Sequence, residues 1–126
     1  MRISTSLRHL TLILGTALLV ACAGPQIHHQ QLVALNQGMD PASVVAQLRL
    51  PPLSTHDTEI DGQRYLFQSY MLNNGMGADQ YLIAYQDGKL KYWGYIDDFR
   101  RHPDGRLTRA VNQVLPAVFE ARQQKK

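Results

Sequence analysis

The chain is poor in cysteine. Cys22 is the only one among its 126 residues, so no disulfide can form within one chain, and an exported domain would lack that stabilisation. Candidate metal ligands are also sparse. His28 and His29 are adjacent, and His56 and His102 are isolated, without the Cys, His or Asp partners that a zinc site needs. The sequence therefore predicts no metal site.

Motifs of catalysis and of phosphate binding are missing as well. Residues 73–77 are glycine-rich but lack the lysine and the following helix of a phosphate-binding loop. Asp57, Glu59 and Asp61 alternate with other residues and so share one side of a strand, where paired carboxylates could act as acid and base in a cleft or guard a sheet edge. We expect no cofactor and no enzymatic activity. The alternative is a small hydrolase that uses Asp57, Glu59, His56 or His102.

The chain has no strong excess of charge. Its 13 basic and 10 acidic residues give a net charge of +3, and loss of the first 21 residues, with Arg2 and Arg8, would reduce it to +1. A nucleic-acid partner is therefore not expected. The charge is uneven, because residues 22–99 hold four basic and eight acidic residues, whereas residues 100–126 hold seven and two. This basic C-terminal segment would suit an acidic partner or an anionic surface, or form a solvated helix face.

The longest uncharged apolar run lies at the N-terminus. Residues 10–20 carry no charge and follow a segment that contains Arg2 and Arg8, which is the order of an export signal. These 11 residues are fewer than the roughly 20 that cross a bilayer as a helix. A cleaved signal peptide is therefore favoured over a permanent transmembrane helix.

The end of this signal resembles the lipobox of bacterial lipoproteins, since residues 19–22 are Leu-Val-Ala-Cys. We expect cleavage between Ala21 and Cys22 and attachment of fatty acids such as palmitate at Cys22, whose thiolate is the strong nucleophile available. The membrane is then a partner through lipidated Cys22. Ala23, which follows, favours the outer membrane, facing the periplasm, in a cell with two membranes.

Helical signals come first in the exported part. Residues 27–37 carry a partial apolar stripe, which predicts a first helix. A second helix is predicted after Asp40, which can cap it, and Pro41, which suits its first turn. The Pro51-Pro52 pair would end this helix, because each ring removes a backbone donor.

The middle of the chain predicts an antiparallel meander of three or four strands. Asp87-Gly88 between two aromatic-rich runs is a strong hairpin signal, and Asp61-Gly62 suggests a second hairpin after a short lead strand. The predicted strands are residues 58–60, 64–72, 79–86 and 89–96. A C-terminal helix follows the turn at residues 103–105, and Pro116 predicts a kink or an end near Leu115.

Alternation divides the last predicted strand into two faces. The two lysines of one set mark it as the solvent side, which would leave Trp93 and Tyr95 half exposed; alternatively, these rings cover the lysine stems or pack under the C-terminal segment. The core set is Leu90, Tyr92, Gly94 and Ile96, and the other set is Lys89, Lys91, Trp93 and Tyr95.

Residues 35–44, with Gly38-Met39 before the predicted second helix, resemble the SmpA/OmlA (BamE-like) family of small envelope lipoproteins. Asp87-Gly88-Lys89-Leu90 is similar to the late hairpin of that family, although Arg49 stands where the family has glycine. The resemblance implies two helices packed on an antiparallel sheet, and a role in outer-membrane assembly or envelope maintenance. The expected fold class is α+β, with the C-terminal helix added. The expected division is residues 1–21 signal peptide, 22–26 tether, 27–99 BamE-like domain and 100–126 basic helical segment.

The expected function is that of a lipid-anchored binding or scaffolding module for envelope proteins, of unassigned oligomeric state. The candidate contact surface combines an aromatic strand face with the basic segment. An inhibitor-like module that plugs an envelope enzyme with residues 73–78 is the alternative. The candidate contact residues are Tyr70, Tyr81, Trp93, Tyr95, Arg100 and Arg101.

Overall fold

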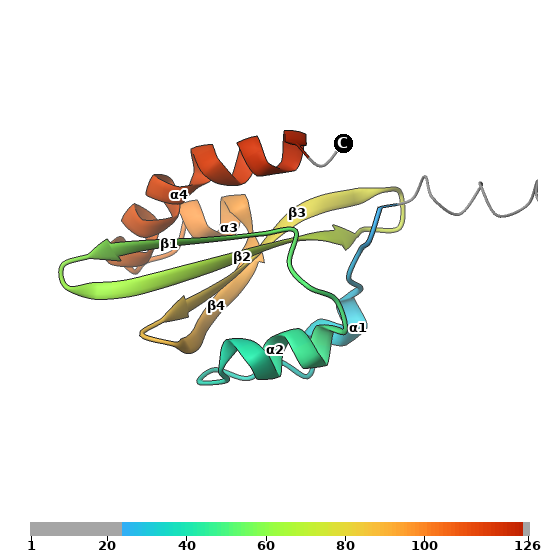
Figure 1. The fold of residues 1–126 in the computed structure, drawn as a ribbon, viewed down its shortest axis with the longest axis horizontal. Coiled ribbons are helices and arrows are strands. Elements are labelled where there is room, and N and C mark those ends of the chain that lie inside the picture. The colour runs from blue at the N-terminus through green and yellow to red at the C-terminus, as the bar shows by residue number, and fades with distance from the viewer. Residues whose placement is uncertain (1–23, 125–126) are drawn as a thin grey trace, which may run out of the picture.

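The computed structural model describes residues 24–124 and is α+β, as predicted. Four antiparallel strands form one sheet in the order β1-β2-β3-β4. Figure 1 shows α1 and α2 on one face of this sheet and α3 and α4 on the other, so the fold has three layers. The elements are α1 His29–Leu32, α2 Pro41–Leu48, β1 Ser54–Ile60, β2 Gln63–Asn73, β3 Ala78–Gln86, β4 Lys89–Tyr95, α3 Ile96–Arg100 and α4 Gly105–Gln124.

Both predicted Asp-Gly hairpins are confirmed. Asp61 and Gly62 have φ of 51° and 80°, and Asp87 and Gly88 have φ of 50° and 81°. Positive φ at both central residues is the requirement of a type I′ turn, whose twist matches that of the flanking strands. The lead strand β1 begins at Ser54, four residues before the predicted start.

The sheet carries a hydrophobic core on each face. We call them the α4-side core, which the last two helices cover, and the N-terminal-side core, which α1, α2 and their flanking residues cover. Helix α4, within the predicted basic helical segment of residues 100–126, buries six residues against the sheet. These six residues are Leu107, Ala110, Val111, Val114, Leu115 and Val118.

The predicted separation of Tyr92 and Ile96 from Trp93 and Tyr95 is confirmed, but Leu90 lies on the opposite face from the one predicted, because a β-bulge interrupts the alternation. Tyr85 pairs with Leu90 but the preceding Ala84 pairs with Tyr92, so Lys91 is an extra residue. Leu90 therefore packs in the N-terminal-side core together with Trp93 and Tyr95, while Tyr92 packs against the α4-side core. Trp93 and Tyr95 are partly accessible, as predicted, but they pack against the N-terminal-side core and so do not lie on a solvent face.

The predicted helix over residues 27–37 is also wrong in extent. Ile27 instead extends the sheet as a parallel bridge to Leu72: its N–H donates to Met71 O at 2.9 Å, and its carbonyl accepts from Asn73 N–H at 3.0 Å. Only α1, four residues long, is helical. The N-terminal end of the described chain is thereby fixed at the β2–β3 end of the molecule.

The second helix follows its sequence signals. Asp40 accepts from Ser43 N–H at 2.8 Å, and Pro41 begins α2. Hydrogen bonding by the Ser43 side chain, and then by its backbone N–H, lowers the pKa of Asp40, because both stabilise the charged carboxylate. The helix ends at Arg49, whose φ of 56° is left-handed, two residues before Pro51.

Helix α4 continues through Pro116 to Gln124, so it does not stop near Leu115. Pro116 lies on the exposed face of the helix. The carbonyl of Asn112, which loses its helical donor at Pro116, belongs to an exposed residue that water can reach.

Candidate functional site

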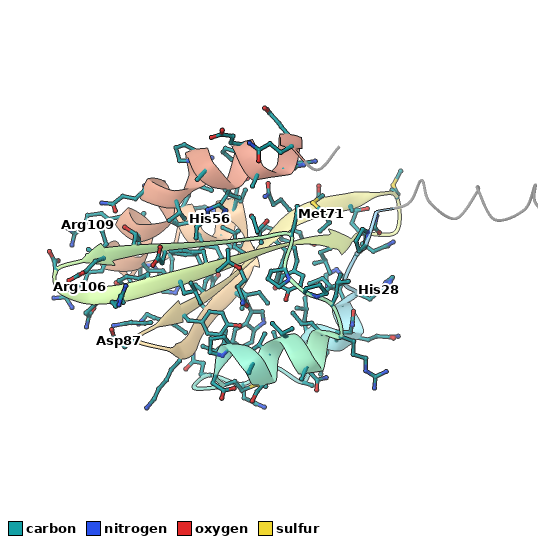
Figure 2. All side chains as sticks on the ribbon, viewed as in Figure 1. His28, His56, Met71, Asp87, Arg106 and Arg109 are labelled. Atoms are coloured by element: carbon teal, nitrogen blue, oxygen red, sulfur yellow. The ribbon has the colours of Figure 1, made fainter. Side chains whose placement is uncertain are left out.

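The residues of the hydrolase hypothesis are not brought together. His56 faces α4 (Figure 2) and contacts Ser54 Oγ at 2.9 Å, whereas Asp57 and Glu59 point to the other face of the sheet as exposed side chains. His102 lies in the α3–α4 connection and packs edge-on to Tyr92, with ring centroids 4.5 Å apart. No cleft joins these four side chains. Within residues 24–124, no group of three or more His, Cys, Asp or Glu residues is placed to hold a metal ion.

Two of the predicted contact residues are buried, which argues against their direct contact with a partner. Tyr70 is 1% exposed and its hydroxyl donates to Leu50 O at 3.1 Å. Tyr81 is 7% exposed and packs edge-on to Tyr95, with ring centroids 5.2 Å apart. Burial raises the pKa of both hydroxyls to about 12. These tyrosines build the core instead, and only Trp93 and Tyr95 of the aromatic set are partly accessible.

The basic segment is matched by acids that the fold brings to it. Arg100 lies 3.7 Å from Asp97 and Arg101 lies 3.9 Å from Asp98. At the other end of the sheet, two further arginines of α4 share one acid of the β1–β2 turn. Figure 2 shows Arg106 and Arg109 beside this turn. The pairs are Arg106–Asp61 at 3.4 Å and Arg109–Asp61 at 2.8 Å.

The uneven charge of the sequence is thus largely matched within the fold. Arg100 and Arg101 remain exposed, so their contact with a partner stays a prediction. The charge pattern alone no longer requires an acidic partner.

A surface groove of about 550 Å³ lies between the C-terminal half of α4, α3 and the N-terminal end of β3. We call it the α4 groove. Its apolar wall includes Phe119, which is 39% exposed, and Ile96. Its basic side chains are Arg101 and Arg122. The lining residues are Asp79, Gln80, Tyr95, Ile96, Asp97, Asp98, Arg101, Phe119 and Arg122.

Gln80 gives this groove a polar floor. The side chain is 6% exposed, and its Nε2 donates to Ser69 Oγ at 2.9 Å. Its Oε1 is buried and accepts no hydrogen bond from any residue between 24 and 124. An unpaired buried carbonyl costs roughly 1–3 kcal/mol, and because this oxygen is buried, a ligand in the groove does not contact it directly. If the oxygen and nitrogen of the Gln80 side-chain amide were exchanged, the oxygen would face Ser69 Oγ and the NH₂ group would be the unpaired one.

Arg122 also lines a second, smaller depression of about 260 Å³. Its other walls come from the N-terminal segment and the sheet, with Met71 on the face toward α4 (Figure 2). The lining residues are Gly24, Pro25, Gln26, Leu53, Met71, Ala78 and Arg122. The predicted cleavage and lipid-attachment residues Ala21 and Cys22 lie outside the described residues, but the chain leads from them directly to this depression.

Comparison with models of protein families, with curated protein sequences and with solved structures finds no match. The likeness to small envelope lipoproteins therefore stays a prediction from the sequence. Across residues 24–124, no helix has the length and apolar character to cross a membrane.

Sequence reasoning missed Gln80, Phe119 and Arg122 as a group. One signal was present, because Gln80, Leu82 and Ala84 alternate along one strand, which puts an amide on a core face. The other two residues lie some 40 positions later in the sequence. Their meeting with β3 depends on how α4 crosses the sheet, which no local pattern encodes.

Proposed function

We propose that this chain is a lipid-anchored, non-catalytic binding module of the cell envelope, held to the membrane through Cys22. Its role would be in outer-membrane assembly or envelope maintenance, as the likeness to BamE-like lipoproteins implies. The observation that carries the proposal is the α4 groove, which shares Arg122 with the depression lined by the N-terminal segment that leads to Cys22.

Metabolic labelling tests the anchor. A bacterial host that expresses the full chain is fed an alkyne analogue of palmitate, and the Cys22→Ser variant is the matched control. We expect label in the wild-type chain and none in the variant, with the wild type in the outer-membrane fraction. An unlabelled wild-type chain of full length would exclude the lipoprotein assignment.

Site-specific photocrosslinking in living cells tests the binding role. A photoreactive residue at Arg101 lies in the α4 groove, and one at Glu59 lies on the exposed, opposite face of edge strand β1. We expect discrete crosslinked envelope proteins from position 101 that position 59 does not give. Identical products from both positions would show non-specific proximity and count against a binding module.

An inhibitor-like module is a second candidate, favoured by the β2–β3 loop. Met76 is 100% exposed at this loop. The loop is held in shape because Gly75 N–H donates to Asn73 Oδ1 and Met76 N–H donates to Asn74 Oδ1, both at 2.9 Å. A photoreactive residue at position 76 that captures an envelope enzyme, while position 101 captures nothing, would favour this candidate.

A further inference from the structure

The surface around the first described residues is nearly uncharged. Two adjoining depressions, of about 260 and 200 Å³, share Pro25, Leu53 and Met71 in their walls. Arg122 is the one charged residue among all those that line either depression. Contiguous apolar surface of this kind marks a contact with another molecule. The further residues of the smaller depression are Leu50, Pro51, Pro52 and Tyr70.

The β2–β3 loop extends this surface. Its residue Met76 is 100% exposed, and residues 73–78 include no charged side chain. The base of the loop is joined to the N-terminal segment, because Asn73 Nδ2 donates to Gln26 Oε1 at 2.9 Å. Figure 1 shows the first described residues beside this loop. We call the combined surface of residues 24–26, 50–53, 70–78 and 122 the loop end.

The opposite end of the sheet, which we call the hairpin end, is charged. It contains both Asp-Gly turns, and Asp61 in the first turn binds Arg106 and Arg109. Asp87 lies in the second turn and Lys89 follows it. Figure 2 shows Arg106, Arg109 and Asp87 at this end. The folded body therefore has one charged end and one largely apolar end.

The anchor proposed at Cys22 leads to the loop end. Gly24 lines the larger of the two depressions. The two residues from Cys22 to Gly24 span at most about 7 Å when fully extended. A bilayer that holds the lipid would therefore lie next to the loop end and far from the hairpin end.

We propose that the loop end docks on the phospholipid bilayer, with Met76 inserted among the headgroups and Arg122 on lipid phosphate groups. The proposal rests on the lipid anchor proposed above, and it adds a second membrane contact that the folded body makes itself. Methionine is flexible and apolar, so it adapts to irregular surroundings. Apolar side chains of membrane-surface segments are buried about 5–10 Å into the boundary between headgroups and acyl chains.

The charge of the loop end suits lipid phosphate. Arg122 is exposed in the last turn of α4 and forms no ion pair with any residue between 24 and 124. Arginine binds phosphate through paired N–H groups. Lys125 and Lys126 follow it in the sequence. The carboxylate of Asp79, at the start of β3, is occupied by Asn74 Nδ2 at 2.8 Å.

A fluorescent probe next to Met76 tests the docking in the lipidated chain. Cys22 would hold its lipid as a thioether, so an introduced cysteine is the free thiol that takes the probe. Gly77→Cys places the probe in the loop, where a Cβ meets nothing within 4 Å beyond its chain neighbours. Lys89→Cys places it at the hairpin end and is the matched control. In phosphatidylethanolamine–phosphatidylglycerol vesicles with nitroxide-labelled lipid, we expect several-fold stronger quenching at position 77 than at position 89.

Three further changes, each made in the Gly77→Cys chain, assign the contacts. Met76→Asp should remove most of the quenching, because a carboxylate is costly to bury in lipid. Arg122→Glu should reduce it, because the anionic surface repels the new charge. Lys89→Glu, the same charge reversal at the hairpin end, is the matched control and should leave the quenching unchanged. Circular dichroism verifies that all three chains stay folded.

Four outcomes overturn the proposal. They are equal quenching at positions 77 and 89, unchanged quenching in Met76→Asp or Arg122→Glu, equal effects of Arg122→Glu and Lys89→Glu, and a photoreactive residue at position 76 that crosslinks to protein rather than lipid. That protein could be a partner or a second copy of this chain. Each outcome leaves palmitate labelling of Cys22 and crosslinking from position 101 untouched, so failure of the docking is distinguishable from failure of the anchored module.

Discussion

Asp61 is both a turn residue and an ion-pair partner. Its φ of 51° is required by the type I′ turn, and its carboxylate binds Arg106 and Arg109 of α4. The hydrogen bond and the charge of Arg109 lower the pKa of Asp61, with a smaller contribution from Arg106. One side chain therefore joins the first hairpin to a helix more than 40 residues away.

The Asp61→Asn variant should remove the ion pairs and keep the turn, because asparagine also adopts positive φ readily. A carboxyl with a lowered folded-state pKa contributes stability above its unfolded-state pKa and loses it as pH falls through the folded-state value. We therefore expect the variant to be less stable than wild type at pH 7 and to converge with it in strong acid. Urea unfolding at a series of pH values measures this difference.

Asp87→Asn is the control for this prediction. Asp87 occupies the same turn position in the second hairpin, with φ of 50°, and forms no ion pair with the described residues. Its side chain accepts from Arg64 N–H at 3.1 Å, which asparagine can replace. A similar pH dependence of the stability difference in both variants would mean that the arginines are not its cause.

At the scale of elements, α4 is a helix that tolerates its proline at a cost. Proline in a helix interior removes one hydrogen bond and costs about 3 kcal/mol relative to alanine. The exposed face of α4 reduces this cost, because water can reach the Asn112 carbonyl.

Pro116→Ala should raise the free energy of unfolding by roughly 1–3 kcal/mol, since it restores the Asn112 hydrogen bond. The adjacent exposed change Ala117→Gly should lower it by about 1 kcal/mol. Thermal and urea unfolding measure both. A stability loss in Pro116→Ala would show that the proline is required by the packing of α4 rather than merely tolerated.

Element types were more predictable from the sequence than their faces and ends. The caps of α2 and both Asp-Gly turns depend on neighbouring residues, so local chemistry predicted them. The bulge at Lys91 was not predictable, because whether Lys91 is paired or extra depends on β3. The strand-like bridge at Ile27 was missed for the same reason, since its partner Leu72 lies 45 residues later.

The candidate site was less predictable than the fold. Exposure of Tyr70 and Tyr81 was judged from one strand face, but that face is covered by α1 and α2. In the sequence, Gln80 differs from Leu82 and Ala84, which follow it on the same strand face, only in being polar. The walls of the α4 groove come from α3 and α4, and their placement is a property of tertiary packing.

At the scale of the whole molecule, the two cores share one sheet. Phe67, Leu82 and Ala84 face α4, while Tyr70, Ile83 and Tyr85 of the same strands face α1 and α2. Neither layer of helices can leave without exposing one complete face of the sheet. We therefore expect a single cooperative unfolding transition.

A chain that ends at Phe99 should not fold cooperatively, because it lacks the six buried residues of α4. Large aromatic side chains such as Tyr65 and Phe67 would be exposed to water. Near-ultraviolet circular dichroism and dye binding to exposed apolar surface test this expectation. Leu107→Ala, which leaves α4 in place, should instead keep one transition and lose about 2–5 kcal/mol. A cooperative transition in the shortened chain would restore residues 27–99 as an independent domain.

The bridge at Ile27 would limit how far the folded body can move from the lipid proposed at Cys22. The five residues from Cys22 to Ile27 span at most about 18 Å when fully extended. A module anchored in this way would therefore stay close to the membrane surface. Its search for a partner becomes diffusion in a plane, and membrane-bound partners meet it at a high effective concentration. A groove that binds weakly then suffices for stable engagement, provided that the partner reaches it within the layer of water next to the bilayer.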